Sequence, residues 1–212
     1  MSTSVSDRST APTAVNTAFL GRVTAWTCAA GGLTGLLAAA VLTIEKLNLA
    51  ADPAYVPTCS INPILSCGSV MSSAQAQAFG VPNSLIGVAG FAVVATIGVA
   101  LLARVRLPRW FWLGVQAGAA FGVLFVHWLI YQSLYVIGAL CPYCMLVWAV
   151  TIAIFLYVTV HNLHDNARAI PSGLRALAAA TARYHSLILV SWYAAIVVAV
   201  LHRFWEYWTT LG

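Results

Sequence analysis

Charged residues are scarce in this sequence. Of its 212 residues, only 7% are Asp, Glu, Lys or Arg, whereas 61% are hydrophobic. A soluble domain carries roughly 25% charged residues, and a disordered chain needs high charge together with low hydrophobicity. The composition therefore excludes both classes and predicts a polytopic α-helical membrane protein.

Lysine is almost absent, since Lys46 is the only one in the chain. The net charge of +5 comes from arginines that stand between apolar runs. Nucleic-acid binding needs basic residues clustered on a polar surface. We therefore expect no nucleic-acid partner and interpret the arginines as determinants of membrane topology.

Apolar runs long enough to span a bilayer, which takes about 20 residues, occur five times. They cover residues 19–44, 81–103, 110–139, 142–160 and 186–207. The first run lacks a short apolar core with a small-residue cleavage site, so we interpret it as a retained anchor rather than a signal peptide. The remaining segments are a disordered tail (1–18), a loop (45–80), a linker (161–185) and a C-terminal part that includes the fifth span (186–212).

The distribution of basic residues predicts the orientation of these spans. With the N-terminus in the cytoplasm, eight of the ten basic residues lie on the cytoplasmic side, and only Lys46 and Arg203 lie outside. Cytoplasmic loops carry the excess of Lys and Arg. We therefore expect a cytoplasmic tail and linker, and an extracytoplasmic loop and C-terminus.

Four of the five cysteines fall on the extracytoplasmic side of this topology. Cys59 and Cys67 lie in the loop, and Cys141 and Cys144 begin the fourth span. Extracytoplasmic compartments allow disulfides to form and persist. Cys28 lies alone inside the first span, where a cysteine usually behaves as a small apolar residue.

The segment Cys141-Pro142-Tyr143-Cys144 has the features of a reactive pair. Proline is well tolerated at the first position of a helix, and the helix N-terminus stabilises a thiolate. Two cysteine pairs on one side of the membrane are typical of an electron relay by thiol–disulfide exchange. Two alternatives stay open: a structural disulfide in the loop, and a zinc site with four thiolates, which the spacing of Cys59 and Cys67 fits poorly.

The segment 59–87, CSINPILSCGSVMSSAQAQAFGVPNSLIG, resembles the loop of the vitamin K epoxide reductase (VKOR) family. The resemblance covers residues 20–160. It rests on the two loop cysteines and on Ser73, the Phe-Gly pair at 79–80 and the Asn-Ser pair at 83–84, with the family's CxxC at Cys141 and Cys144. The related DsbB type of quinone reductase carries its CxxC first in the sequence, so the order of the cysteine pairs favours VKOR.

The resemblance implies an all-α integral membrane fold. Residues 19–160 would form a four-helix catalytic bundle around a quinone (menaquinone, ubiquinone or a vitamin K type), with the loop capping the site and a fifth transmembrane helix beside it. It also implies a separate thioredoxin-like, DsbA-type partner in the extracytoplasmic space, because this chain stops directly after its fifth span. The chain would sit in a bacterial inner membrane.

The family's relay implies a role for each cysteine. A reduced partner attacks Cys59 of a Cys59–Cys67 disulfide, Cys67 attacks Cys141 of a Cys141–Cys144 disulfide, and Cys144 passes the electrons to the quinone. The reaction would support disulfide formation in secreted proteins. Reduction of vitamin K epoxide as the main reaction, and a non-catalytic membrane scaffold stapled by disulfides, are the alternatives.

Quinone binding is assigned to five residues. Asn83 would donate to a carbonyl of the quinone, although a helix cap or turn is its ordinary role, and Ser73 would orient the loop or polarise the site. Met71, Phe79 and Trp148 would line the ring pocket, with Trp148 standing where many family members have tyrosine.

The polar side chains outside the quinone site are expected to have structural roles or to be solvated. His127, Tyr131 and Tyr135 share one face of the third span, where we expect packing and interfacial anchoring rather than proton delivery. Glu45, Lys46 and Asp52 lie near the outer surface and are expected to be solvated.

Overall fold

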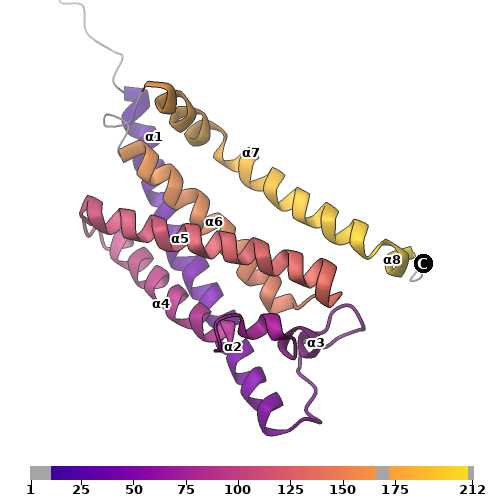
Figure 1. The fold of residues 1–212 in the computed structure, drawn as a ribbon. Coiled ribbons are helices and arrows are strands. Elements are labelled where there is room, and N and C mark those ends of the chain that lie inside the picture. The colour runs from indigo at the N-terminus through magenta and orange to yellow at the C-terminus, as the bar shows by residue number, and fades with distance from the viewer. Residues whose placement is uncertain (1–10, 166–171, 210–212) are drawn as a thin grey trace, which may run out of the picture.

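The computed structural model describes residues 11–165 and 172–209, which form helices joined by short connections and one long loop (Figure 1). No strand occurs among the residues described. In the described part of the chain, five helices are long and apolar enough to cross a membrane, as the sequence predicts: Phe19–Ala51, Asn83–Leu102, Arg109–Ile137, Pro142–Leu163 and Ala176–Arg203. The chain is an all-α integral membrane protein.

The first span is one continuous helix built from three segments. They are α1 (Ala11–Trp26), the π-helical turn η1 (Thr27–Gly31) and α2 (Gly32–Ala51). The loop then contains α3 (Cys67–Met71) and η2 (Ala74–Gln77). The remaining elements are α4 (Asn83–Leu102), α5 (Arg109–Tyr131), the π-helical turn η3 (Gln132–Ile137), α6 (Pro142–Asp165), α7 (Ser172–Arg203) and α8 (Trp205–Thr209).

Helices extend beyond several of the predicted spans, and α6 continues past residue 160 to Asp165. α2 continues to Ala51 rather than ending near residue 44, because Leu42 and Leu49 pack under the loop. α1 includes residues 11–18, which were predicted as part of a disordered tail, and α7 begins at Ser172 inside the predicted linker. Residues 1–10 of that tail and 166–171 of that linker lie outside the described residues.

The first four spans form a bundle in which α2 packs against both α4 and α6, and α5 packs against α6. α7 runs along the outside of this bundle, on the side of α6 (Figure 1). Buried Cys28, Ala39, Phe91 and Ile154 belong to one apolar cluster between α4, α6 and the first span.

Two close helix contacts depend on glycine. A Cβ atom at Gly98 of α4 would overlap the backbone of Ala29 in η1, and one at Gly32 would overlap the backbone of Ala95. Small residues let membrane helices approach each other closely. The first span and α4 therefore meet backbone to backbone.

Polar side chains fasten α7 to the bundle. His127 lies between the Val123 carbonyl, 2.7 Å from its Nδ1, and the Trp192 indole, which donates to its Nε2 at 2.9 Å. The Tyr193 hydroxyl donates to the Ala149 carbonyl. These bonds agree with the packing role expected for His127. Tyr131 and Tyr135 contact each other and are more than half exposed, which is compatible with the expected anchoring at the membrane interface.

We predict that Gly98→Ala lowers the free energy of unfolding by about 2 kcal/mol, because the added methyl group forces α4 away from η1. Thermal or detergent-induced unfolding of the purified protein measures the effect. Gly90→Ala on the same helix is the matched control, since its Cβ atom would meet open space. Equal stability of the two variants would contradict the close contact.

Candidate redox site and apolar cavity

A short backbone bridge joins the two cysteine-bearing segments. The Leu140 amide donates to the Ile64 carbonyl at 2.7 Å, and the Ser66 amide donates to the Leu140 carbonyl at 2.9 Å. The residues that directly follow Ser66 and Leu140 are Cys67 and Cys141. The bridge therefore sets these two cysteines side by side although 74 residues separate them.

Each of these cysteines also marks the beginning of a helix. Ser66 caps α3, its hydroxyl accepting the Ser69 amide, and Cys67 is the first helical residue. Cys141 immediately precedes Pro142, the first residue of α6, as the sequence predicts. The Sγ atoms of Cys67 and Cys141 lie 3.1 Å apart, within exchange distance.

The loop pair forms a disulfide between Cys59 and Cys67, while Cys141 and Cys144 are free thiols. The Sγ atoms of Cys59, Cys67 and Cys141 all lie within 4.8 Å of one another. In this disulfide state, two of the three sulfurs are bonded to each other and do not serve as thiolate ligands. Cys28 is buried in the first span, in the apolar cluster with Phe91.

Glu45 is buried, which corrects the expectation that it is solvated. Its side chain is 5% exposed and accepts hydrogen bonds from the Tyr55 and Thr58 hydroxyls. The adjacent Lys46 donates to the Met71 carbonyl at the end of α3, at 2.6 Å. The extension of α2 beyond the apolar run thus holds the loop on both sides of its disulfide, whereas Asp52 is exposed as expected.

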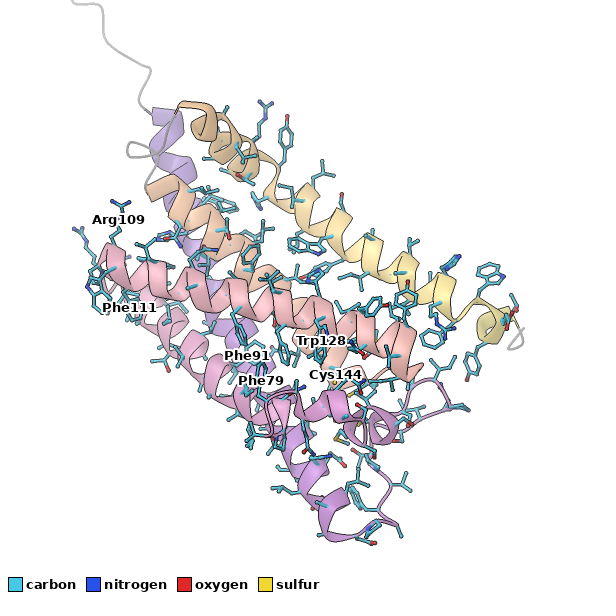
Figure 2. All side chains as sticks on the ribbon, viewed as in Figure 1. Phe79, Phe91, Arg109, Phe111, Trp128 and Cys144 are labelled. Atoms are coloured by element: carbon cyan, nitrogen blue, oxygen red, sulfur yellow. A yellow bond between two sulfur atoms is a disulfide. The ribbon has the colours of Figure 1, made fainter. Side chains whose placement is uncertain are left out.

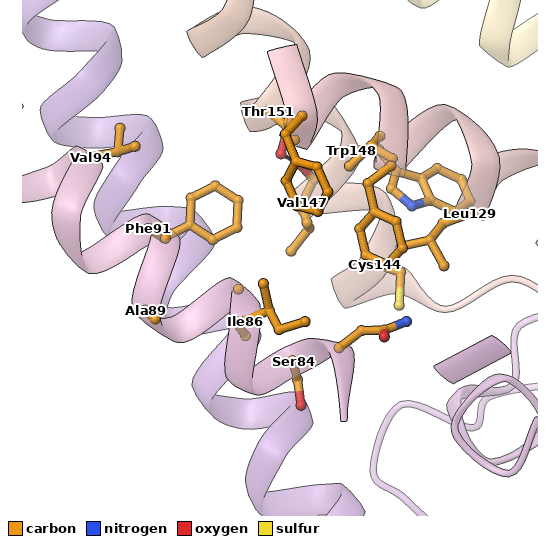
Figure 3. A pocket seen from close by; sticks show the side chains of 18 of the residues that line it. Ser84, Ile86, Ala89, Phe91, Val94, Leu129, Cys144, Val147, Trp148 and Thr151 are labelled. Atoms are coloured by element: carbon orange, nitrogen blue, oxygen red, sulfur yellow. Dashed lines mark hydrogen bonds between the residues drawn. The ribbon is translucent and has the colours of Figure 1, made fainter. Parts of the chain in front are cut away.

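An apolar cavity of about 780 Å³ begins at Cys144 and extends along α4 and α5. Figure 3 shows Cys144 and Val147 of α6 across this space from Ile86 and Phe91 of α4. In Figure 2, Cys144 lies where the bundle meets the loop. In the CxxC pair, Cys144 therefore faces the apolar cavity, and Cys141 faces the loop disulfide.

Four of the five residues predicted to bind a quinone line this cavity. They are Met71, Ser73, Asn83 and Trp148. Phe79 is not among the lining residues: its ring is 54% exposed and packs on Phe121 and Phe125, which do line the cavity. Phe79 therefore stands behind the wall of the cavity rather than in it.

The amide of Asn83 holds the loop over the cavity. Its Nδ2 donates to the Gln75 carbonyl at 2.7 Å, and its Oδ1 accepts the Ala78 amide at 3.1 Å. Pro82, not Asn83, occupies the cap position of α4. Asn83 therefore does not cap α4, and its side chain contacts η2 and the residue that follows η2 instead. These two bonds leave the second Nδ2 hydrogen available to a ligand.

The sequence interpretation missed the glycines of the cavity wall. Gly90 on α4 and Gly114 and Gly118 on α5 line the cavity, and a Cβ atom at any of them would meet open space. The four-residue spacing from Gly114 to Gly118 places both on one face of α5. This spacing is visible in the sequence, but on its own it also fits close helix packing.

The surroundings of Cys141 favour its thiolate form. Hydrogen bonding from the Cys144 side chain, assisted by the Cys144 and Tyr143 amides, lowers the pKa of Cys141 below its usual range although burial opposes this. The Cys144 amide lies 3.4 Å from the Cys141 sulfur. The Cys141 sulfur thus accepts a hydrogen bond from a backbone amide at the start of α6, as a side-chain oxygen does in an ordinary helix cap.

These observations define a membrane protein equipped for thiol–disulfide redox chemistry beside an apolar chamber. A sequence model of the vitamin K epoxide reductase family matches residues 26–159, and the chain belongs to this family. The match confirms the resemblance stated above and places the protein among membrane redox enzymes of the disulfide and quinone type. Comparison with individually curated proteins gave no match.

We predict that Glu45→Ala lowers the free energy of unfolding by about 3 kcal/mol, because two hydrogen bonds to a buried carboxylate are lost. Detergent-induced unfolding measures this. Asp52→Ala, which removes an exposed carboxylate from the same segment, should change stability by no more than about 0.5 kcal/mol. Equal effects of the two substitutions would show that Glu45 does not hold the loop.

Alkylation kinetics test the lowered pKa of Cys141, in a protein whose three cysteines outside the CxxC are serine. A lowered pKa keeps the thiolate populated as the pH falls, so the midpoint of the rate–pH profile should lie below the usual value of about 8.5. Cys144→Ala should move this midpoint upward, whereas Tyr143→Phe keeps the backbone donors and should not. An unchanged midpoint in Cys144→Ala would disprove the assigned cause.

Proposed function

We propose that this protein is a quinone-dependent thiol oxidase. It would regenerate the disulfide of an extracytoplasmic, thioredoxin-like protein and so support disulfide formation in secreted proteins. The observation that carries this proposal is the 3.1 Å contact between Cys67 and Cys141, which links the loop disulfide to the thiol pair at the cavity.

The reaction begins at the loop. A partner thiolate attacks Cys59 and breaks the Cys59–Cys67 bond, leaving a mixed disulfide at Cys59 and a thiolate at Cys67. The second thiol of the partner resolves the mixed disulfide, so the partner is oxidised and the loop pair is reduced. Val56 and Ile61 flank Cys59 and are each 70% exposed, which supports docking of a protein at this stretch.

The electrons then move inward by disulfide exchange. The Cys67 thiolate attacks Cys141 of an oxidised CxxC pair and releases Cys144, after which Cys59 attacks Cys67 and releases Cys141. This leaves a loop disulfide and two CxxC thiols, which is the pairing found in the structure. The lowered pKa of Cys141 makes it a good leaving group in the second exchange.

The cavity fits a membrane quinone in size and chemistry. Ligand sites commonly measure about 300–1,000 Å³ and are mostly apolar with a few polar groups, as is this cavity of about 780 Å³. Asn83, Ser73 and Lys46 supply polar groups to its lining, which also includes Cys144. When bound, a quinone would accept two electrons and two protons, while Cys141 and Cys144 lose theirs and form a disulfide.

The distribution of basic residues supports one membrane orientation. In the topology predicted from the sequence, eight of the ten basic residues lie on the cytoplasmic side, so the positive-inside rule favours a loop, a CxxC pair and a C-terminus outside the cytoplasm. A bacterial inner membrane suits this arrangement, because the thiol partner then works in an oxidising compartment.

We predict that Cys141→Ala and Cys144→Ala reduce quinone turnover to less than about 1% of the wild-type rate. The assay follows quinone reduction by ultraviolet absorbance, with a reduced thioredoxin-like protein as electron donor. Cys59→Ala and Cys67→Ala should lose activity with this donor but keep it with a small dithiol, because the dithiol reduces the CxxC pair directly.

Cys28→Ala is the control and should react like the wild type. Wild-type rates in all five variants, or no turnover in the wild type, would reject the oxidase and favour the stapled scaffold. Supplying vitamin K epoxide in place of quinone tests the other alternative, which a higher kcat/KM for the epoxide would favour.

A further inference from the structure

The helix that leads to Cys141 ends in an irregular way. η3 stops at Ile137, Gly138 adopts a left-handed conformation with φ of 70°, and the chain continues into the backbone bridge. The last carbonyl groups of a helix lack donors within the helix. Arg203, the last residue of α7, donates from Nε to one of them, the Leu134 carbonyl, at 2.8 Å.

Phe204 supports the same region by packing. Its side chain is 7% exposed and belongs to one buried cluster with Leu134, Leu140 and Ile64. Leu140 and Ile64 are the two sides of the backbone bridge that aligns the cysteines. The end of α7 thus bonds to the helix before Cys141, and Phe204 shares one buried cluster with both sides of the bridge.

We propose that Arg203 and Phe204 are positioning residues that hold Cys141 within exchange distance of Cys67. This inference rests on the disulfide relay proposed above. It gives a role in the reaction to a helix outside the family match, which ends at residue 159. Of the residues that the structure describes, those that line the cavity lie between positions 39 and 154, so α7 acts on the sulfur contact and not on the ligand.

Oxidative cross-linking tests the positioning directly. The full-length protein keeps Cys67 and Cys141 as its only cysteines, the other three being serine. Diamide then takes one hydrogen from each thiol as the Cys67–Cys141 disulfide forms, and the reaction is quenched with a maleimide and followed by mass spectrometry. Arg203→Gln and Phe204→Ala should each slow this reaction about tenfold, since small displacements of reacting atoms cost large factors in rate.

Matched variants separate positioning from a general loss of structure. Arg203→Lys keeps a cationic donor and Phe204→Leu keeps an apolar filler, so both should recover most of the rate. Leu201→Ala removes a side chain of the same helix that is 46% exposed, and should react like the unmodified background. If Phe204→Ala fails to fold, Arg203→Gln decides, because Arg203 is exposed and its replacement empties no buried space.

The outcomes distinguish this inference from the relay on which it rests. Rapid cross-linking that is equal in the background, Arg203→Gln and Phe204→Ala would overturn the positioning role alone. Absence of cross-linking in the background would instead reject the relay. In turnover assays with otherwise wild-type cysteines, positioning predicts a lower kcat with an unchanged KM for quinone, and a raised KM with an unchanged kcat would overturn it.

Discussion

Two backbone hydrogen bonds at Leu140 hold the redox centre together. The bonds run to Ile64 and from Ser66, so the loop and the start of α6 share one register. Each cysteine comes directly after a bridged residue, and a shift of one residue would turn its side chain to the opposite side of the strand-like segment. The contact between Cys67 and Cys141 is therefore set by the main chain rather than by the flexible thiols.

Apolar packing and two charged side chains stabilise the region around the bridge. Cys59, Cys67 and Cys141 lie in one buried apolar cluster with Met71, which keeps water from the sulfurs. Glu45 and Lys46, neighbours on α2, fasten the loop through hydroxyl and carbonyl partners. In a chain with so few charges, those placed near the cysteines serve to hold backbone and loop in place.

The spans and the helix start at the CxxC segment could be predicted from the sequence because each leaves a local signal. A run of apolar residues predicts a span by length alone, and Cys141-Pro142-Tyr143-Cys144 predicts a helix start. Burial of Glu45 had no such signal, since it depends on Tyr55 and Thr58 folding back onto α2. The position of Phe79 behind Phe125 likewise depends on how the loop lies over α5.

Substitutions at the glycines of the cavity wall would change the space for a ligand without disturbing the packing of the fold. A methyl group added at Gly90, Gly114 or Gly118 would enter empty space and displace no protein atom, unlike one at Gly98. The room for a ligand can thus shrink in small steps while the helix contacts stay intact. Under the proposed function, descendants of this sequence could exchange one lipid-soluble electron acceptor for another through single substitutions, without first acquiring compensating changes in the core.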